Sequence, residues 1–212
     1  NFPAIYQAYE DRLRRTGNID FGDLIMLPVK LMQSNANIKA HMHRRFKVVM
    51  VDEYQDANVA QFKLLEQLVG ENTYVCVVGD DDQSIYKFRG AEVQNILNFP
   101  NHFDGTTIIK LEKNYRSIEQ VLDVANDVIK NNQDRFDKQL KPVRPKGEQP
   151  VLVFLDSNFD ETEFCSQVIQ NAHEQGVPYS DWAVLYRTNS QSLGFETDFL
   201  HKKIPYVIVG SL

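Results

Sequence analysis

Hydrophobic and polar positions follow two kinds of pattern along the chain. In several stretches apolar residues recur every three or four positions, which indicates amphipathic helices. Between them lie short unbroken apolar runs rich in β-branched residues, which are typical of strands buried on both faces. The patterns predict helices near residues 5–13, 20–27, 35–47, 59–69, 91–99, 117–131, 160–175 and 191–202. They predict strands over residues 48–52, 73–78, 107–111, 151–155, 182–186 and 206–209.

The order of these elements predicts the fold class. Strands alternate with helices, which is the arrangement of an α/β protein with parallel sheets flanked by helices. A polar stretch over residues 133–149, with Pro142, Pro145 and Gly147, reads as a loop or linker. A second run of alternating strands and helices follows it. The 212 residues are enough for one large domain or two small ones.

Composition narrows the class of protein. The chain is 42% hydrophobic and 25% charged, as expected for a globular protein with a core, and its net charge of −6 argues against a dedicated nucleic-acid-binding module. A local basic channel on an acidic body stays compatible with that charge. Cys76 and Cys165 form no motif, and the five histidines have no metal-site spacing. With no signal peptide and no membrane-spanning apolar run, we expect a cytoplasmic protein without membrane contact.

Three predicted strands end in unusual polar clusters. They are Asp52-Glu53-Tyr54-Gln55-Asp56, Gly79-Asp80-Asp81-Asp82-Gln83 and Asn114-Tyr115-Arg116-Ser117. Ligands of open parallel sheets bind outside the carboxyl ends of the strands, so neighbouring ends are expected to form one crevice. A carboxylate there can hold Mg²⁺ together with substrate phosphates, and a second can act as base for water. Taken singly, each cluster also fits a solvated acidic turn or a surface ion pair; together they favour metal-assisted phosphoryl transfer.

A further motif lies between the second and third clusters. The sequence Tyr86-Lys87-Phe88-Arg89-Gly90 places an aromatic residue between two cations. Base stacking combined with phosphate contact needs this combination. Phe88 could equally be a core aromatic.

Taken together, these clusters resemble motifs of the UvrD/Rep/PcrA group of superfamily 1 DNA helicases. Three further segments fit that family's order: Asp20-Phe21-Gly22-Asp23-Leu24-Ile25 before the clusters, and Ala183 to Ser192 and Ile204-Pro205-Tyr206 after them. The central matches are Val51 to Asp56, Val78 to Tyr86, Arg89-Gly90-Ala91 and Leu111 to Ser117. The resemblance covers nearly the whole chain.

The resemblance implies parts of two RecA-like (P-loop NTPase) domains, residues 1–112 and 113–212, with ATP between them and single-stranded DNA across the top. By this resemblance Asp52 holds Mg²⁺, Glu53 activates water and Gln83 senses the γ-phosphate. Tyr115 lies against the nucleotide, and Arg116 acts as an arginine finger. Tyr86 and Phe88 contact DNA bases, and Arg89 couples DNA to the ATP site. The family implies translocation on single-stranded DNA and unwinding at junctions with duplex, in repair or replication restart, with proteins of those pathways as partners.

The chain departs from the family pattern in one major respect. No Gly-x-x-x-x-Gly-Lys-Ser/Thr occurs in it, so the phosphate-cradling loop is missing. We therefore expect an internal helicase fragment that does not turn over ATP alone. Two other functions remain open: an interaction module that keeps the fold without catalysis, and a metal-dependent nuclease built on Asp52, Glu53 and Asp80. The nuclease hypothesis leaves Gln83 and Arg116 unexplained.

Overall fold

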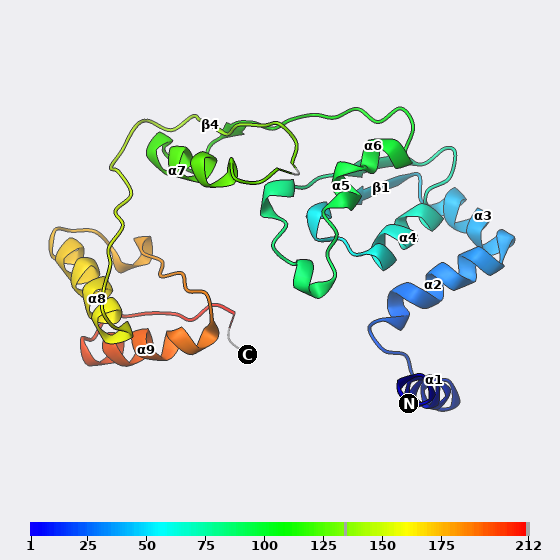
Figure 1. Ribbon diagram of the computed structural model, residues 1–212, viewed down its shortest axis with the longest axis horizontal. Helices are drawn as coiled ribbons and strands as arrows, with labels where there is room; N and C mark the ends of the chain where they lie inside the picture. Colours follow the sequence, from blue (N-terminus) through cyan, green and yellow to red (C-terminus); the bar gives the residue numbers. More distant parts are fainter. Residues whose placement is uncertain (134, 211–212) are drawn as a thin grey trace. The chain divides into compact units, whose positions relative to one another are not determined.

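The computed structural model describes residues 1–133 and 135–210, and only the backbone of Arg89. These residues form two compact units, 1–149 and 150–212. The helices of the first unit are α1 (Phe2–Thr16), α2 (Asp23–Ser34), α3 (Ala36–Arg45), α4 (Val59–Leu68), α5 (Gln94–Leu97), α6 (Phe99–His102) and α7 (Glu119–Ile129). Its strands are β1 (Val48–Val51), β2 (Tyr74–Val77), β3 (Lys113–Asn114) and β4 (Lys141–Pro142). The second unit contains α8 (Asn158–Glu174) and α9 (Ser192–His201) (Figure 1).

The strands pair in parallel, as the sequence predicts. β1 pairs with β2, with Val48 opposite Tyr74 and Val51 opposite Val77. β3 pairs with β4 in a second, shorter sheet. In-register ends of parallel strands lie side by side, so the segments after β1 and β2 emerge together. The helices around these strands confirm the predicted α/β class with parallel sheets flanked by helices.

Four of the six predicted strands do not form. No strand forms at the predicted positions 107–111, 151–155, 182–186 and 206–209. Many of their apolar side chains are exposed, including Leu185 at 93% and Val207 at 87%. A strand needs hydrogen bonds from a neighbouring strand, and an apolar run does not specify where that neighbour comes from. The third strand of the first unit forms instead at Lys113–Asn114, just after the predicted run.

A local sequence signal, a capping box, fixes where α4 begins after β1. Asn58 Oδ1 accepts a hydrogen bond from the Gln61 backbone amide at 3.0 Å, and Gln61 Oε1 accepts one from the Asn58 backbone amide at 2.9 Å. This capping box satisfies two backbone donors at the start of α4. α4 then packs against α2 and α3. The helix therefore begins at a fixed point shortly after the polar residues that end β1.

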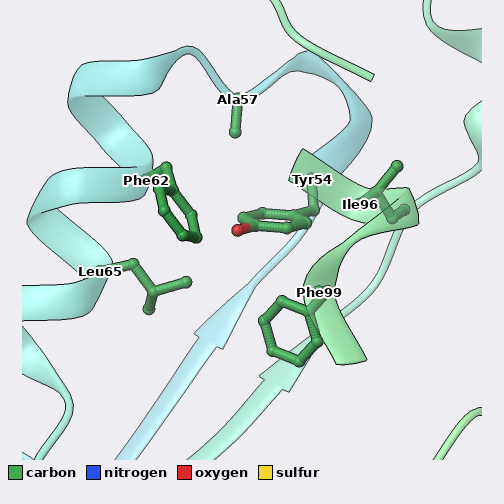
Figure 2. Packing of buried hydrophobic residues seen from close by; sticks show 6 residues of the cluster. All are labelled: Tyr54, Ala57, Phe62, Leu65, Ile96 and Phe99. Carbon is green, nitrogen blue, oxygen red and sulfur yellow. The ribbon is translucent and has the colours of Figure 1, made fainter. Parts of the chain in front are cut away.

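The core of the first unit surrounds Tyr54. Phe99 meets the Tyr54 ring edge to face at a centroid distance of 5.6 Å, and Figure 2 shows Phe62 and Leu65 of α4 on the side to which the hydroxyl points. Burial raises the pKa of the Tyr54 hydroxyl to about 12, and the charge of Glu66 acts in the same direction. Because Tyr54 follows Glu53 directly, this packing anchors the polar end of β1 to the core.

The second unit is built from one helix pair. Ser157 caps the start of α8, and its hydroxyl accepts a hydrogen bond from the Asp160 amide at 3.2 Å. Ile169 of α8 packs with Phe195 and Phe199 of α9 and with Ile204. None of the helices in the described part of the chain combines the length and the apolar composition needed to cross a bilayer.

Candidate nucleotide and nucleic-acid site

The end of β1 presents two carboxylates in a fixed turn. Asp52 and Glu53 are exposed, and Asp52 Oδ1 accepts a hydrogen bond from the Glu53 amide at 2.9 Å. Glu53 has a left-handed backbone with φ of 50°, which is uncommon for a residue other than glycine and costs conformational energy. The chain reverses there, and the Tyr54 amide donates to the Val78 carbonyl at 3.0 Å. The turn therefore joins the end of β1 to the end of β2.

Gln55 links the two strand ends, a role that its position in the sequence does not predict. Its side chain is 2% exposed. Nε2 donates to Glu53 Oε2 at 2.7 Å, and Oε1 accepts from the Asp80 amide at 3.0 Å. The Gln55 carbonyl also accepts from the Ser84 hydroxyl at 3.2 Å. Its place in the Asp52–Asp56 motif was the only available signal, since no periodicity marks a buried amide.

Gly79 leaves the space that Gln55 occupies. A Cβ at this position would lie 2.6 Å from Gln55 Oε1 and 2.9 Å from Ile96 Cδ1. Real Cβ atoms essentially never approach neighbours so closely, so any other residue here must displace the Gln55 amide. The glycine in the second cluster thus serves packing between the two loops.

The end of β2 positions Gln83 through Asp80. Asp80 Oδ2 accepts a hydrogen bond from Gln83 Nε2 at 2.8 Å, while Oδ1 accepts from the Asp82 amide at 3.1 Å. Asp81–Gln83 forms one 3₁₀ turn. The predicted residues Asp52, Glu53 and Gln83 therefore belong to two adjacent loops joined through Gln55 and Asp80.

Two basic side chains from residues 135–138 form ion pairs with the acidic loop after β2. Arg135 forms a bidentate pair with Asp82, both N–O distances being 2.8 Å. Lys138 contacts Asp80 at 2.7 Å and also pairs with Asp81. Burial of Asp82 acts against its charged form, but the hydrogen bond from Arg135 and the charge of Lys138 outweigh burial and hold the pKa of Asp82 below its usual range.

The third polar cluster lies apart from the β1–β2 sheet. Asn114 ends β3, and its Oδ1 accepts hydrogen bonds from the amides of Arg116 at 2.9 Å and Ser117 at 2.8 Å. The side chains of Tyr115 and Arg116 are exposed, Tyr115 at 70%. The sequence places all three strand ends in one crevice; the structure joins the first two in one sheet and puts the third after β3, which pairs with β4.

The aromatic motif lies on the surface after the loop of residues 79–83, which we call the Gln83 loop. Tyr86 and Phe88 have ring centroids 5.9 Å apart, and Phe88 is 73% exposed. Phe88 is therefore outside the core, which removes the core-aromatic interpretation. The side chain of Arg89 lies outside the part of the chain that the structure describes.

The carboxylate of Asp52 at the end of β1 suits a metal ion whose other ligands come from a bound phosphate. Within the described residues, no three His, Cys, Asp or Glu side chains gather as a complete metal cage. Mg²⁺ does not need such a cage, because one or two carboxylates and substrate phosphates usually hold it. The exposed Asp52 carboxylate, fixed at one oxygen by the Glu53 amide, meets that requirement.

Comparisons with known proteins show which family the chain is similar to. Residues 1–104 match the UvrD/REP helicase N-terminal domain family, and residues 109–212 match the UvrD-like helicase C-terminal domain family. The ATP-dependent DNA helicase PcrA of Leuconostoc citreum is 42% identical over 207 residues, which are 97% of this chain and 28% of the relative. The protein of the same name from Staphylococcus aureus strain NCTC 8325 is 40% identical over 98% of this chain. The chain spans about 28% of the length of these curated relatives.

Proposed function

The chain belongs to the UvrD/PcrA-type superfamily 1 helicases, and from that premise we propose that it carries part of the ATP-hydrolysing and DNA-binding apparatus of an ATP-dependent DNA helicase. The observation that supports this most is the hydrogen-bonded pair of strand-end loops containing Asp52, Glu53 and Gln83. We assign residues 1–112 to the first RecA-like domain and 113–212 to the second.

The proposal gives a separate role at the phosphates to each of Asp52, Glu53 and Gln83. Asp52 would hold Mg²⁺, which would supply charge neutralisation at the phosphate oxygens. Glu53 accepts the proton of the attacking water, and its carboxylate is oriented for this by the 2.7 Å hydrogen bond from Gln55. Gln83 contacts the γ-phosphate with the amide that Asp80 now holds.

Tyr115 and Arg116 supply the opposite side of the nucleotide. Both side chains are exposed on a turn whose backbone is fixed by Asn114. Tyr115 offers a ring for the nucleotide to lie against. The guanidinium of Arg116 is permanently charged and matches phosphate oxygens with its planar fork. Arg116 therefore acts as the arginine finger.

Tyr86, Phe88 and Arg89 form the proposed contact with single-stranded DNA. Exposed aromatic rings on one short turn suit base stacking, which tolerates any sequence. Arg89, at the end of that turn, connects the DNA path to the Gln83 loop. We extend the proposal to junctions of single- and double-stranded DNA, to repair or replication proteins as partners, and to the cytoplasm; both cysteines are free thiols, as a reducing compartment favours.

A chimera tests the proposal. Residues 1–212 replace the corresponding stretch of Leuconostoc citreum PcrA, and phosphate release is measured with and without single-stranded DNA. We expect DNA-stimulated hydrolysis from the folded chimera and none from the 212 residues alone, which contain no phosphate loop. A folded chimera without stimulated hydrolysis would contradict the proposal and favour an interaction module. DNA cleavage by the 212 residues with Mg²⁺ and no ATP would favour the nuclease.

A further inference from the structure

One segment contacts two of the three segments assigned to the nucleotide: the Gln83 loop after β2 (residues 79–83) and the turn after β3 (residues 114–117), which we call the Arg116 turn. It comprises residues 135–144, and we call it the strap. It lies within the first compact unit, as do the Gln83 loop and the Arg116 turn. Its start is basic and meets the acidic loop after β2; its end is extended and pairs with β3.

The start of the strap contacts each of the three consecutive aspartates. Arg135 makes the bidentate pair with Asp82, and the Phe136 amide donates to Asp81 Oδ2 at 2.8 Å. Lys138 reaches Asp80 at 2.7 Å and Asp82 at 3.2 Å. The side chains of Arg135 and Lys138 are only 16% and 17% exposed. Bidentate, partly buried pairs of this kind hold geometry far better than exposed ion pairs do.

Asp80 transmits this contact to Gln83. One oxygen of the Asp80 carboxylate meets Lys138, and the other accepts the hydrogen bond from Gln83 Nε2. Removing the lysine leaves the Asp82 amide, at 3.1 Å, as the remaining partner of that Asp80 oxygen, so the carboxylate is held less firmly. The partner of the Gln83 amide is then less fixed, although no residue that touches the nucleotide has changed.

The end of the strap holds the turn that carries Arg116. The Lys141 amide donates to the Glu112 carbonyl at 2.7 Å, and the Val143 amide donates to the Asn114 carbonyl at 2.9 Å. The Arg144 guanidinium donates to the Arg116 carbonyl at 2.8 Å. These bonds fix the backbone of the turn and leave the Arg116 side chain exposed.

We infer that the strap sets the position of Gln83 relative to Arg116, with Arg135 and Lys138 as positioning residues that act through the aspartates of the Gln83 loop. The inference rests on the proposed function, because it gives Gln83 and Arg116 their roles at the phosphate. In the proposed function these two residues contact the same γ-phosphate. A segment that is bonded to both of their loops can hold the two side chains at a fixed distance from each other. A misplacement of about 1 Å at a reacting group can cost about 10²-fold in rate.

The test uses the chimera described above with Lys138→Met or Arg135→Gln. We expect kcat for DNA-stimulated hydrolysis to fall by at least tenfold and at most about 10²-fold, with little change in KM for ATP or in melting temperature. Lys138→Arg should recover part of the rate. Lys130→Met and Lys146→Met are matched controls, since both lysines pair with a carboxylate but are well exposed. They should leave kcat unchanged. If Lys138→Met lowers the melting temperature, Arg135→Lys, which keeps the charge and loses the fork, carries the test.

A double-mutant cycle separates this inference from the proposed function. In a chimera with Gln83→Ala, adding Lys138→Met should cause no further loss of kcat, because the lysine acts through Gln83. If Gln83→Ala alone leaves kcat unchanged, the role proposed for Gln83 is wrong. If Gln83→Ala lowers kcat but Lys138→Met has no effect, or multiplies the loss independently, the strap does not position Gln83 and the inference is overturned.

Discussion

At the ends of β1 and β2, side-chain hydrogen bonds hold the reactive groups. At the end of β3, hydrogen bonds hold only the backbone of the reactive residues, and their side chains are exposed to solvent. Glu53 accepts a hydrogen bond from the buried Gln55, and Gln83 donates one to the Asp80 carboxylate. Tyr115 and Arg116 follow a backbone fixed by Asn114 and Arg144, and both are exposed.

This difference indicates that the two regions contribute to a catalytic site in different ways. The β1–β2 loops are preorganised, so their groups need little rearrangement when a nucleotide binds. The Arg116 turn has a fixed backbone and an exposed guanidinium, and the guanidinium acts only when a phosphate lies within its reach. Substitutions in the first region should therefore disturb geometry, whereas a substitution of Arg116 should remove one interaction and leave the fold intact.

The largest effect is expected for Arg116→Ala in the chimera. Arginine fingers contribute about 10³–10⁵ in kcat, whereas an exposed ion pair contributes about 0–1 kcal/mol to stability. We expect the loss in kcat with an unchanged melting temperature, and poor rescue by Arg116→Lys because a point charge lacks the fork. Steady-state hydrolysis measures it. A near-normal kcat would make this arginine a surface residue and break the comparison.

Gln55→Ala should show the opposite profile, with stability affected as well as rate. The substitution leaves the Asp80 amide and the Glu53 carboxylate without their shared partner. Leaving a buried polar group unsatisfied costs about 1–3 kcal/mol, and the partly buried Asp80 amide should cost less than the full amount, while the exposed Glu53 carboxylate can bind water instead. We therefore expect a lower melting temperature together with a lower kcat. Gly79→Ala should reproduce both effects, because its Cβ displaces the same amide. An unchanged melting temperature in both variants would mean that the loops are not preorganised through Gln55.

The sequence predicts the part of this arrangement that depends on local patterns. The apolar runs at residues 48–52 and 73–78 locate β1 and β2, and the polar residues after them identify the strand-end loops. The exposed strand-end residues Asp52 and Gln83 are recognisable by type and position.

The remainder depends on contacts between distant residues. The Arg135–Asp82 pair joins residues 53 positions apart, and nothing near Arg135 in the chain signals that partner. The burial of Gln55 depends on the space that Gly79 leaves. Runs such as 151–155 have the composition of a buried strand, yet in this structure they find no strand to pair with, so their pattern alone predicts an element that does not form.

The smallest effect is expected for Phe88→Ala. Loss of one stacking partner costs about 1–3 kcal/mol per base, and a phenyl ring should lie toward the lower end of that range. Because Phe88 is exposed and outside both core clusters, melting temperature and DNA-independent hydrolysis should not change. Fluorescence titration with labelled single-stranded DNA measures the affinity. Unchanged affinity would remove Phe88 from the DNA path.

The central claim, that the preorganised loops of β1 and β2 are the hydrolytic half of an ATP site, is tested most directly by Glu53→Gln in the chimera. The amide keeps the shape of the side chain but cannot accept a proton from water. With fluorescent ATP and a phosphate-release assay on the same sample, we predict nearly normal binding and a loss of turnover of about 10²–10⁴-fold. Turnover close to that of the parent chimera, with binding intact, would contradict the account.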